Sequence, residues 1–578
     1  MPRAWALGLA LMIGCAGMVW GQVEQREEIA QVEHRAVWAH FSDIKDPETL
    51  QKSVDRMAGA GMNAIYILVW HNGGQAAYRS ELCPMVSGAA EGFDPLGALI
   101  EAAKPKGIDV HAWFVNGSYG YARGGLFDTH PDWQLQSGGS SGDRWYDLGK
   151  PEVRQFQRDV MLECLRNYDV AGIHFDYIRF SGKGMCHCEH CQGQVQERWG
   201  IPPVTVESAT FPLACQMSGN PLGRPSTAQV LASFEDSVPA VTMNALGQGK
   251  AALLNWQADM TGNLAVPELA RRILESFGTD EGAAVYQIRS AATIARYGRS
   301  SLERGMNWLR GMGYKPVGIE EPDLAKVPAG ATVIFSSQYL IAPEIAQWLE
   351  EFVTAGGNAL FVDGPVFAIK EPALQRVLGL TGTARYFSAM KAVIPAAGQE
   401  LIPAGPAVDL ELEQKRAGAW EEFRRDVVTD LVRQVYQGAK QIKPEAQVSA
   451  AVFYNKSAAD SVCQDWYGWL NEGIIGYVLP MAYTEENGKL QEALEEWKAA
   501  DPDLARIIPG LSIYSRDAEG KAIPRDLDLV RQQEELCRLY KARGNCYFSL
   551  VYLNEALREQ FAEGPYAQAA KAYYPAGR

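Results

Sequence analysis

Short apolar segments alternate with amphipathic ones along the first part of the chain. Four apolar segments are predicted to be β-strands, and each is followed by a polar or aromatic loop and a helical pattern. They span residues 35–40, 63–70, 109–114 and 171–180. Strands that alternate with helices form parallel βαβ units. The pattern therefore predicts four units of a parallel α/β fold before residue 205.

The same alternation returns after residue 412. A long amphipathic helix is predicted over residues 420–440, and strands over 448–454, 474–483, 507–514 and 546–553. Four strands before the gap and four after it make eight, the number that closes a (β/α)₈ TIM barrel. We therefore predict a barrel in two parts, residues 33–205 with strands 1–4 and residues 412–578 with strands 5–8.

The intervening residues 206–411 are too many for a loop and have a βα pattern of their own. They predict a flavodoxin-like three-layer α/β/α domain, inserted after strand 4, that resembles the glutamine-amidotransferase-like domains appended to some glycoside hydrolases. Its core has no cysteine after a strand, because Cys215 precedes the βα units. We expect a structural role, or the binding of a small molecule or partner, rather than catalysis.

The first residues have the composition of a secretory signal peptide. Arg3 is followed by an apolar run up to Trp20 and then by a polar stretch, which predicts cleavage after residue 21. A loose lipobox makes Cys15 an alternative site of lipid attachment. The expected location is secreted or periplasmic, with no membrane span in the mature chain. The net charge of −15 disfavours nucleic acid as a partner.

The fourth predicted strand has the most informative polar residues. Period-2 alternation places His174 and Asp176 on one face, opposite an apolar face that packs on helices. Catalytic groups of such barrels lie at the carboxyl ends of strands, so Asp176 is the leading catalytic candidate. The structural alternative is an ion pair between Asp176 and Arg179 that closes the top of the barrel.

Glycoside hydrolysis needs a second carboxylate across the scissile bond. Glu485 follows the sixth strand and is the first candidate for general acid/base. Asp465 is the second, although aspartate at a helix start is often only an N-cap. Nothing in the sequence marks the nucleophile elbow of an α/β-hydrolase, and no Ser–His–Asp arrangement is convincing.

Strand-end position also predicts a set of substrate-binding residues. For each aromatic residue among them, the alternative to substrate binding is packing at the rim of the barrel. The set is Trp38, His40, His71, Asn72, Trp113, Asn116, His174, Arg179, Tyr454, Tyr483, Tyr514 and Tyr552.

Three cysteines and two histidines lie within six residues after the fourth strand. Cys186, Cys188 and Cys191 have the ligand chemistry of a structural zinc site. The fourth ligand would be His190, His187 or a remote residue; a local disulfide and a free-thiol turn are the alternatives. No cofactor is expected to be required for catalysis.

Several motifs in order carry a resemblance to the bacterial glycosyl-hydrolase-like family 10. They are HRAVWAHF, AAYRSELCP, THPDW, WYDLGKPEVR, GIHFDYIRF, WEEFRRDVVTDLV, QDWYGWLNEG and PMAYTE. The family consists of exported (β/α)₈ proteins related to α-galactosidase-type barrels. The resemblance implies hydrolysis of a bacterial polysaccharide or cell-wall glycan, with the nucleophile position on Asp176. The alternative is a non-catalytic glycan-binding barrel. The insertion departs from the family pattern.

Overall fold

The computed structural model describes residues 32–575 with short gaps. The residues left out between them are 72, 121–124, 136–143, 183–185, 187, 204–210, 220–223, 259–264, 298–299, 337, 339, 363–369, 383–386, 403–404, 406–407 and 518–519. The predicted signal peptide and Cys15 therefore lie outside the described residues. Across the described part of the chain, no helix has the length and apolarity needed to cross a bilayer. Contacts divide the chain into two compact units, the first holding a barrel and the second most of the inserted segment.

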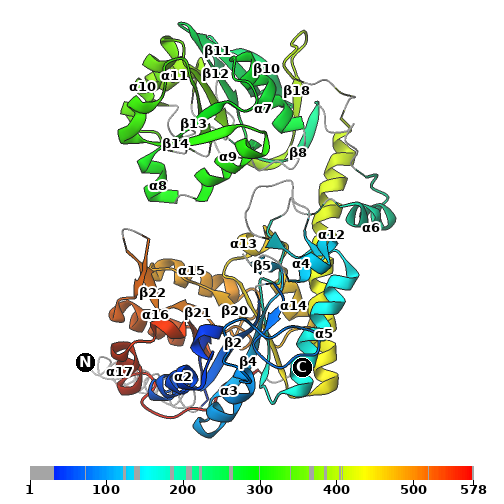
Figure 1. Ribbon diagram of the computed structural model, residues 1–578, viewed down its shortest axis with the longest axis vertical. Helices are drawn as coiled ribbons and strands as arrows, with labels where there is room; N and C mark the ends of the chain where they lie inside the picture. The colour runs from blue at the N-terminus through cyan, green and yellow to red at the C-terminus, as the bar shows by residue number, and fades with distance from the viewer. Residues whose placement is uncertain are drawn as a thin grey trace, which may run out of the picture. The chain divides into compact units, whose positions relative to one another are not determined.

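Eight parallel strands form the closed barrel of the first unit (Figure 1). The strands are β1 (His34–Ala39), β2 (Ala64–His71), β4 (Asp109–Val115), β7 (Gly172–Asp176), β19 (Gln447–Phe453), β20 (Tyr477–Met481), β21 (Gly510–Ser512) and β24 (Gly544–Phe548). Each strand pairs in parallel with the next, and β1 closes the ring by pairing with both β2 and β24. The predicted eight-stranded parallel barrel is confirmed.

Each barrel strand is followed by a helix, and Figure 1 shows these helices around the strands. In chain order they are α2 (Pro47–Gly59), α3 (Pro95–Ala103), α5 (Pro151–Asn167), α12 (Leu410–Ile442), α14 (Trp466–Glu472), α15 (Asn487–Trp497), α16 (Leu527–Leu539) and α17 (Glu555–Glu563). Prolines and capping aspartates mark several of their first turns, as at Asp46 and Asp94. The insertion lies between β7 and the helix α12 that completes its βα unit.

Polar side chains fill the barrel at the amino-terminal ends of the strands. The Nδ1 atom of His34 lies 3.1 Å from the carbonyl oxygen of Tyr573, an acceptor, so Nδ1 carries the proton. The Tyr66 hydroxyl, 2.9 Å from Nε2, is then the donor to His34 and accepts in turn from Tyr477 at 2.8 Å. Burial lowers the pKa of His34 to about 4, which keeps the ring neutral.

A second network at this end uses Tyr574. Its hydroxyl donates to Asp109 Oδ2 at 2.9 Å and lies 2.8 Å from His111 Nε2. Because the hydroxyl proton is used on Asp109, His111 Nε2–H must be the donor in the second bond. The segment with Tyr573 and Tyr574 therefore completes the polar interior at the base of the barrel.

A buried ion network lies beside β1. The Glu33 carboxylate pairs with Arg35 at 2.8 Å and with Arg538 at 2.7 Å. Glu33 and Arg35 have 0% and 1% of their side-chain surface exposed, so neither charge is solvated by water. The two groups depend on each other for compensation.

The second unit contains a nine-stranded mixed sheet in the order β14-β13-β15-β16-β12-β11-β10-β18-β8. The first five are parallel: β14 (Lys315–Glu320), β13 (Ala284–Arg289), β15 (Thr332–Ser336), β16 (Asn358–Val362) and β12 (Gly249–Leu254). The other four are antiparallel: β11 (Pro239–Leu246), β10 (Gln229–Phe234), β18 (Phe387–Pro395) and the edge strand β8 (Leu213–Gly219).

Two hydrophobic clusters lie on opposite faces of this sheet. Ala252 and Leu254 of β12 join the cluster with α7 (Ala265–Ser276) and α9 (Ser300–Gly311). Ala251 and Leu253 alternate to the other face, toward α10 (Pro343–Thr354) and α11 (Pro372–Leu378). Helices therefore cover both faces of the parallel part of the sheet.

The strand order differs from the flavodoxin-like order that the βα pattern predicts. A flavodoxin-like sheet has the order 2-1-3-4-5, with its last strand following the others in the chain. Here the edge beside β16 is occupied by β12, which precedes the other parallel strands, and four antiparallel strands extend the sheet from it. The hairpin of β11 and β12 supplies both the fifth parallel strand and the start of the antiparallel part, which local periodicity does not reveal.

Candidate active site

Asp176 is the last residue of β7, at the carboxyl end of the barrel strands. Its side chain is buried, with 6% of the residue surface exposed. The backbone N–H of Tyr177 donates to Oδ1 at 2.7 Å, and Trp113 Nε1–H donates to Oδ2 at 3.2 Å. Burial raises the pKa of Asp176 to about 6, opposed by the Tyr177 amide, the charge of Arg179 and Trp113. This carboxyl therefore titrates close to neutral pH.

Arg179 does not form the predicted alternative ion pair with Asp176. Within the described part of the chain, no ion pair joins the two side chains. The guanidinium lies 4.6 Å from the centre of the Tyr177 ring and 5.0 Å from that of Trp145, and Nη1–H donates to the Phe180 carbonyl at 3.2 Å. Its charge still favours the ionised form of Asp176, although burial is the larger effect.

His174 and Trp38 lie inside the barrel below Asp176 and are both fully buried. Trp38 Nε1–H donates to His174 Nε2 at 3.0 Å, so the ring proton is on Nδ1, which donates to Ser449 Oγ at 2.9 Å. Burial holds the pKa of His174 well below its usual value. These side chains bond to each other and to Ser449, an arrangement that supports the strand that carries Asp176; their contact with a substrate stays a prediction.

Aromatic rings that follow the later strands gather at the mouth of the barrel. Tyr483 stacks on Phe548 with ring centres 5.3 Å apart and planes at 27°, and Tyr514 stacks on Tyr552 at 5.1 Å and 27°. Tyr514 also lies 6.2 Å from Phe548, which joins the two stacks. Burial and the nearby charge of Asp176 hold the pKa of Tyr483 well above its usual value. Tyr483 is therefore a protonated hydroxyl near Asp176.

Two histidines lie at the ends of the neighbouring strands β1 and β2. The His40 ring is 5.4 Å from Trp113 and 5.5 Å from Phe548. Burial lowers the pKa of His40, and it lowers that of His71 to about 4, with the charge of His40 as a second cause. Both rings are neutral at pH 7 and can donate or accept hydrogen bonds.

Asp43 is a buried carboxylate that the sequence reasoning missed. It ends a short 3₁₀ helix, Phe41–Asp43, directly after β1, and its Oδ2 accepts the His40 backbone N–H at 2.9 Å. Burial raises its pKa. Its position in the sequence could have identified it, because Asp43 is an acidic residue shortly after a barrel strand, as Glu485 is.

The two candidates for general acid/base differ in their surroundings. Asp465 is the N-cap of α14 and accepts the Gly468 backbone N–H at 3.1 Å, which is the structural alternative considered for it. Glu485 is exposed beyond the end of β20, and its charge raises the pKa of Arg525 against the larger lowering effect of burial. Glu485 is thus the candidate whose carboxylate is not used as a cap.

The other strand-end candidates lie outside the group around Asp176. Asn116 is fully buried, and its amide donates to Gln157 of α5 at 3.1 Å, so this side chain is used inside the protein. Its backbone N–H donates to the Asp176 carbonyl at 2.8 Å, which supports the strand end. Tyr454 is half-buried, with its carbonyl accepting from Trp497. Asn72 lies outside the described residues.

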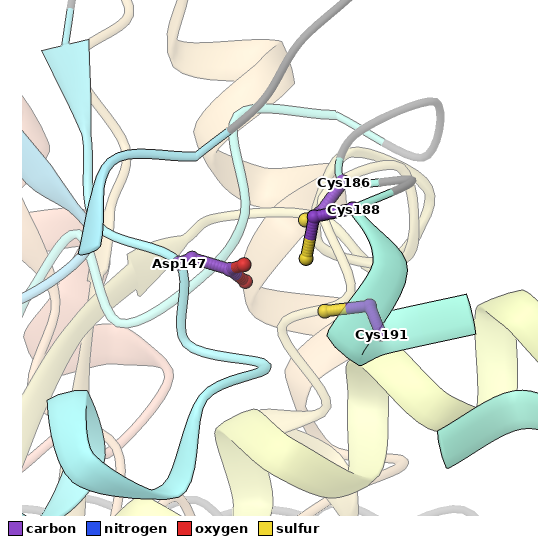
Figure 2. A group of neighbouring side chains, drawn as sticks. All are labelled: Asp147, Cys186, Cys188 and Cys191. Atoms are coloured by element: carbon purple, nitrogen blue, oxygen red, sulfur yellow. The ribbon is translucent and has the colours of Figure 1, made fainter. Parts of the chain in front are cut away.

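The three cysteines lie together, and the side chain closest to them is a remote one, which is among the alternatives for the fourth ligand. Cys186, Cys188 and Cys191 face Asp147, and all four side chains are buried (Figure 2). His190 is exposed on α6 (Glu189–Trp199) and is not among these four side chains. Its position next to Cys191 on the helix turns its side chain about 100° away. His187 lies outside the described residues.

Comparison with known proteins places the barrel in a family. The family described as Glycosyl hydrolase-like 10 matches residues 31–188 and 401–521, which belong to the two parts of the barrel. Glycosyl hydrolase DigH of Escherichia coli K12 is 27% identical over 146 residues, covering 21% of this chain and 32% of that protein. Glycosyl hydrolase YngK of Bacillus subtilis 168 is 28% identical over 139 residues, covering 22% and 26%. The chain thus spans about a third or less of the length of these relatives.

Solved structures that align with this chain include the following two. The PgaB (BpsB) glycoside hydrolase domain from Bordetella bronchiseptica aligns with a TM-score of 0.44 and 11% identity, covering 92% of this chain and 98% of that one. The β-galactosidase from Bacillus circulans aligns with a TM-score of 0.41 and 9% identity, covering 89% and 50%.

Proposed function

The barrel of this chain belongs to the glycosyl hydrolase-like 10 family, and on this premise we propose that the protein hydrolyses glycosidic bonds of a bacterial polysaccharide or cell-wall glycan. The observation that carries the proposal is Asp176, a buried carboxylate with a pKa of about 6 at the carboxyl end of a barrel strand. Such a group is protonated in part and ionised in part near neutral pH, which suits proton transfer and attack on a sugar carbon.

The aromatic stacks beside Asp176 support a sugar as the ligand. The faces of Tyr483 with Phe548 and of Tyr514 with Tyr552 give flat apolar surfaces next to polar hydroxyls. His40 and His71 add neutral hydrogen-bonding rings. In this proposal the aromatic stacks bind the sugar ring and the histidines hydrogen-bond its hydroxyl groups.

Asp176 acts in this mechanism as the principal carboxylate, and Glu485 as the general acid/base. Glu485 is preferred to Asp465 because capping of α14 already uses the Asp465 side chain. Glu485 would protonate the leaving-group oxygen while Asp176 stabilises or attacks the developing oxocarbenium centre. No cofactor takes part in these steps. The bacterial glycan as substrate and the export of the protein to the periplasm or medium, with cleavage after residue 21 or lipidation at Cys15, follow from the family resemblance and the sequence of the first residues.

The test measures reducing sugars released from bacterial glycans, including peptide-stripped peptidoglycan strands, by the full mature chain. Asp176→Asn is expected to lower kcat by about 10²–10⁴-fold with the far-UV circular dichroism unchanged. Glu485→Gln should lose natural-substrate activity but keep much of its activity on aryl glycosides, whose leaving groups need no protonation. Glu486→Gln is the matched control, an adjacent exposed carboxylate that pairs with Lys489 at the start of α15.

Release by wild type and not by Asp176→Asn would support the hydrolase. Binding of a glycan that survives Asp176→Asn, without release by any form of the protein, would replace the proposal by a non-catalytic glycan-binding barrel.

A further inference from the structure

Four buried side chains converge in a group that the proposed reaction does not use: one precedes β7 in the chain and three follow it. The Sγ atoms of Cys186, Cys188 and Cys191 and a carboxylate oxygen of Asp147 all lie within 4.8 Å of one another. Figure 2 shows the Asp147 carboxylate turned toward the sulfur atoms of the cysteines. We propose that these four residues bind one zinc ion, in a closed structural site with Asp147 as the fourth ligand.

The geometry fits a tetrahedral ion. Zinc bonds of about 2.3 Å to sulfur and about 2.0–2.2 Å to carboxylate oxygen put tetrahedral ligand atoms about 3.5–3.8 Å apart. The four ligand atoms lie within 4.8 Å of one another and all four side chains are buried, so a contraction of about 1 Å or less brings them to tetrahedral spacing. Thiolates select zinc, copper(I) or iron–sulfur clusters over magnesium or calcium, and a single carboxylate is an ordinary zinc ligand.

The local backbone supports binding by the thiolates. Cys188 is the N-cap of α6, and Cys191 lies in the first turn of this eleven-residue helix. The amino-terminal end of a helix favours negative charge, which thiolate ligands carry. Cys186 has a φ of 60°, a left-handed conformation that residues other than glycine adopt rarely. The cysteines are not joined by disulfides.

Asp147 is held in place by its own loop. The Gly149 backbone N–H donates to Oδ1 at 3.0 Å, and the Asp147 backbone N–H donates to the Trp133 carbonyl at 2.8 Å. An N–H bound to one carboxylate oxygen fixes the direction of the other, which is how outer hydrogen bonds orient metal ligands. The carboxylate is therefore positioned independently of the cysteines.

The ion would connect to the candidate active site through Trp145. This ring lies 5.8 Å from Tyr177 and 5.0 Å from the guanidinium of Arg179, which follow Asp176 in the chain. Gly117 joins the two segments: its N–H donates to the Tyr177 carbonyl and its carbonyl accepts the Tyr146 N–H, both at 2.8 Å. A side chain at Gly117 would collide with the backbone of Tyr177 and Arg179 and with the Trp145 ring. Zinc at Asp147 thus stabilises the segment that packs behind Asp176, and its four protein ligands leave no position for a substrate.

The first experiment measures metal in the full chain, purified without a metal-affinity column, by elemental analysis. About one zinc per chain is expected, and replacement by cobalt should give a thiolate-to-cobalt charge-transfer band and the visible spectrum of a tetrahedral ion. Less than a tenth of an equivalent after incubation with zinc under reducing conditions would overturn the proposal. A disulfide among the three cysteines in unreduced protein, found by mass spectrometry of peptides, would overturn it as well.

Variants identify the ligands. Cys188→Ser should weaken zinc binding by more than about 100-fold, and Asp147→Asn by about 10–100-fold. Asp147→Cys should restore stoichiometric binding with a stronger charge-transfer band, which a merely structural role for Asp147 would not produce. Cys164→Ala is the control, a buried cysteine of α5 outside the cluster, and should keep one zinc. Retention of zinc by Cys188→Ser would overturn the assignment. These metal readouts do not depend on whether the barrel hydrolyses a glycan.

Discussion

Replacement of Asp176 by asparagine should change how the stability of the barrel depends on pH. The pKa of Asp176 is raised by burial from 3.8 to about 6 in the folded protein. A carboxyl whose pKa is higher in the folded than in the unfolded state binds protons preferentially when folded. Its favourable contribution is therefore complete below pH 3.8 and is lost as the pH rises through 6. An uncharged asparagine removes this loss.

The magnitude follows from the shift of about 2 pH units. At 1.36 kcal/mol per unit, ionisation lowers the free energy of unfolding by about 3 kcal/mol between pH 3 and pH 8. About 2 kcal/mol of this change falls between pH 4.5 and pH 8. Asparagine cannot accept from both the Tyr177 amide and the Trp113 indole as the carboxylate does, which costs about 1–2 kcal/mol at every pH. This constant cost cancels when the stability difference between variant and wild type at pH 4.5 is subtracted from that at pH 8. What remains is the effect of the buried charge.

Differential scanning calorimetry of wild type and Asp176→Asn at pH 4.5, 6 and 8 measures this difference. Unfolding entropy of about 2 cal/mol/K per residue, over a barrel of about 300 residues, converts 2 kcal/mol into about 3 °C. The Tm of the variant should therefore rise relative to wild type by about 3 °C from pH 4.5 to pH 8. Asp528→Asn, which removes an exposed carboxylate of α16, controls for net charge. An offset that is equal at both pH values would refute a raised pKa, and one of opposite sign would refute the desolvation argument.

Three further changes test other parts of the structure. Trp113→Phe removes the indole N–H that favours ionised Asp176, so the pKa of Asp176 should rise further and the pH profile of glycan hydrolysis should move to higher pH. Glu33→Gln leaves the buried Arg35 without a full countercharge and should lower the free energy of unfolding by about 3–5 kcal/mol. Urea denaturation measures this loss, and a value below about 1 kcal/mol would contradict the buried network. Tyr574→Phe should lower the free energy of unfolding by about 1–3 kcal/mol in the same assay, because the hydrogen bonds of its hydroxyl are lost. Tyr573→Phe should lower it little, because only the backbone carbonyl of Tyr573 contacts His34. Equal losses in the two variants would count against this network.

The barrel strands could be predicted because their signal is local. Apolar runs of β-formers between turn residues gave the eight strands, and alternation along β7 placed Asp176 on the interior face at the strand end. Strand ends were less accurate: the fourth strand was predicted to reach residue 180 but stops at Asp176. Tyr177 has a φ of 47°, which ends the extended backbone there. Periodicity does not encode that change of direction.

The sequence was less informative about how deep a side chain lies in the barrel and about which remote residues it contacts. His174 and Asp176 share a face, yet one is bonded inside the barrel and the other lies at the strand end, because alternation gives the face and not the distance from the mouth. Asp147 meets the cysteine cluster only through the folded path of the chain, about 40 residues away along the sequence. A spacing rule that searches short motifs therefore favoured the neighbouring His190. The order of strands in the second unit was missed for the same reason.

The pairing of β7 with β19 has a consequence for biogenesis. His174 and Ser449, bonded across these strands, are 275 residues apart in sequence. Closing so long a loop costs about 3 kcal/mol more in chain entropy than closing one of ten residues. During synthesis the first four strands must wait, with β7 as an unpaired edge, until the ribosome has produced the whole insertion. If the insertion folds early, it shortens the flexible loop that separates β7 from β19, and the two strands can pair sooner. Slow folding of the second unit would therefore appear as aggregation of the first.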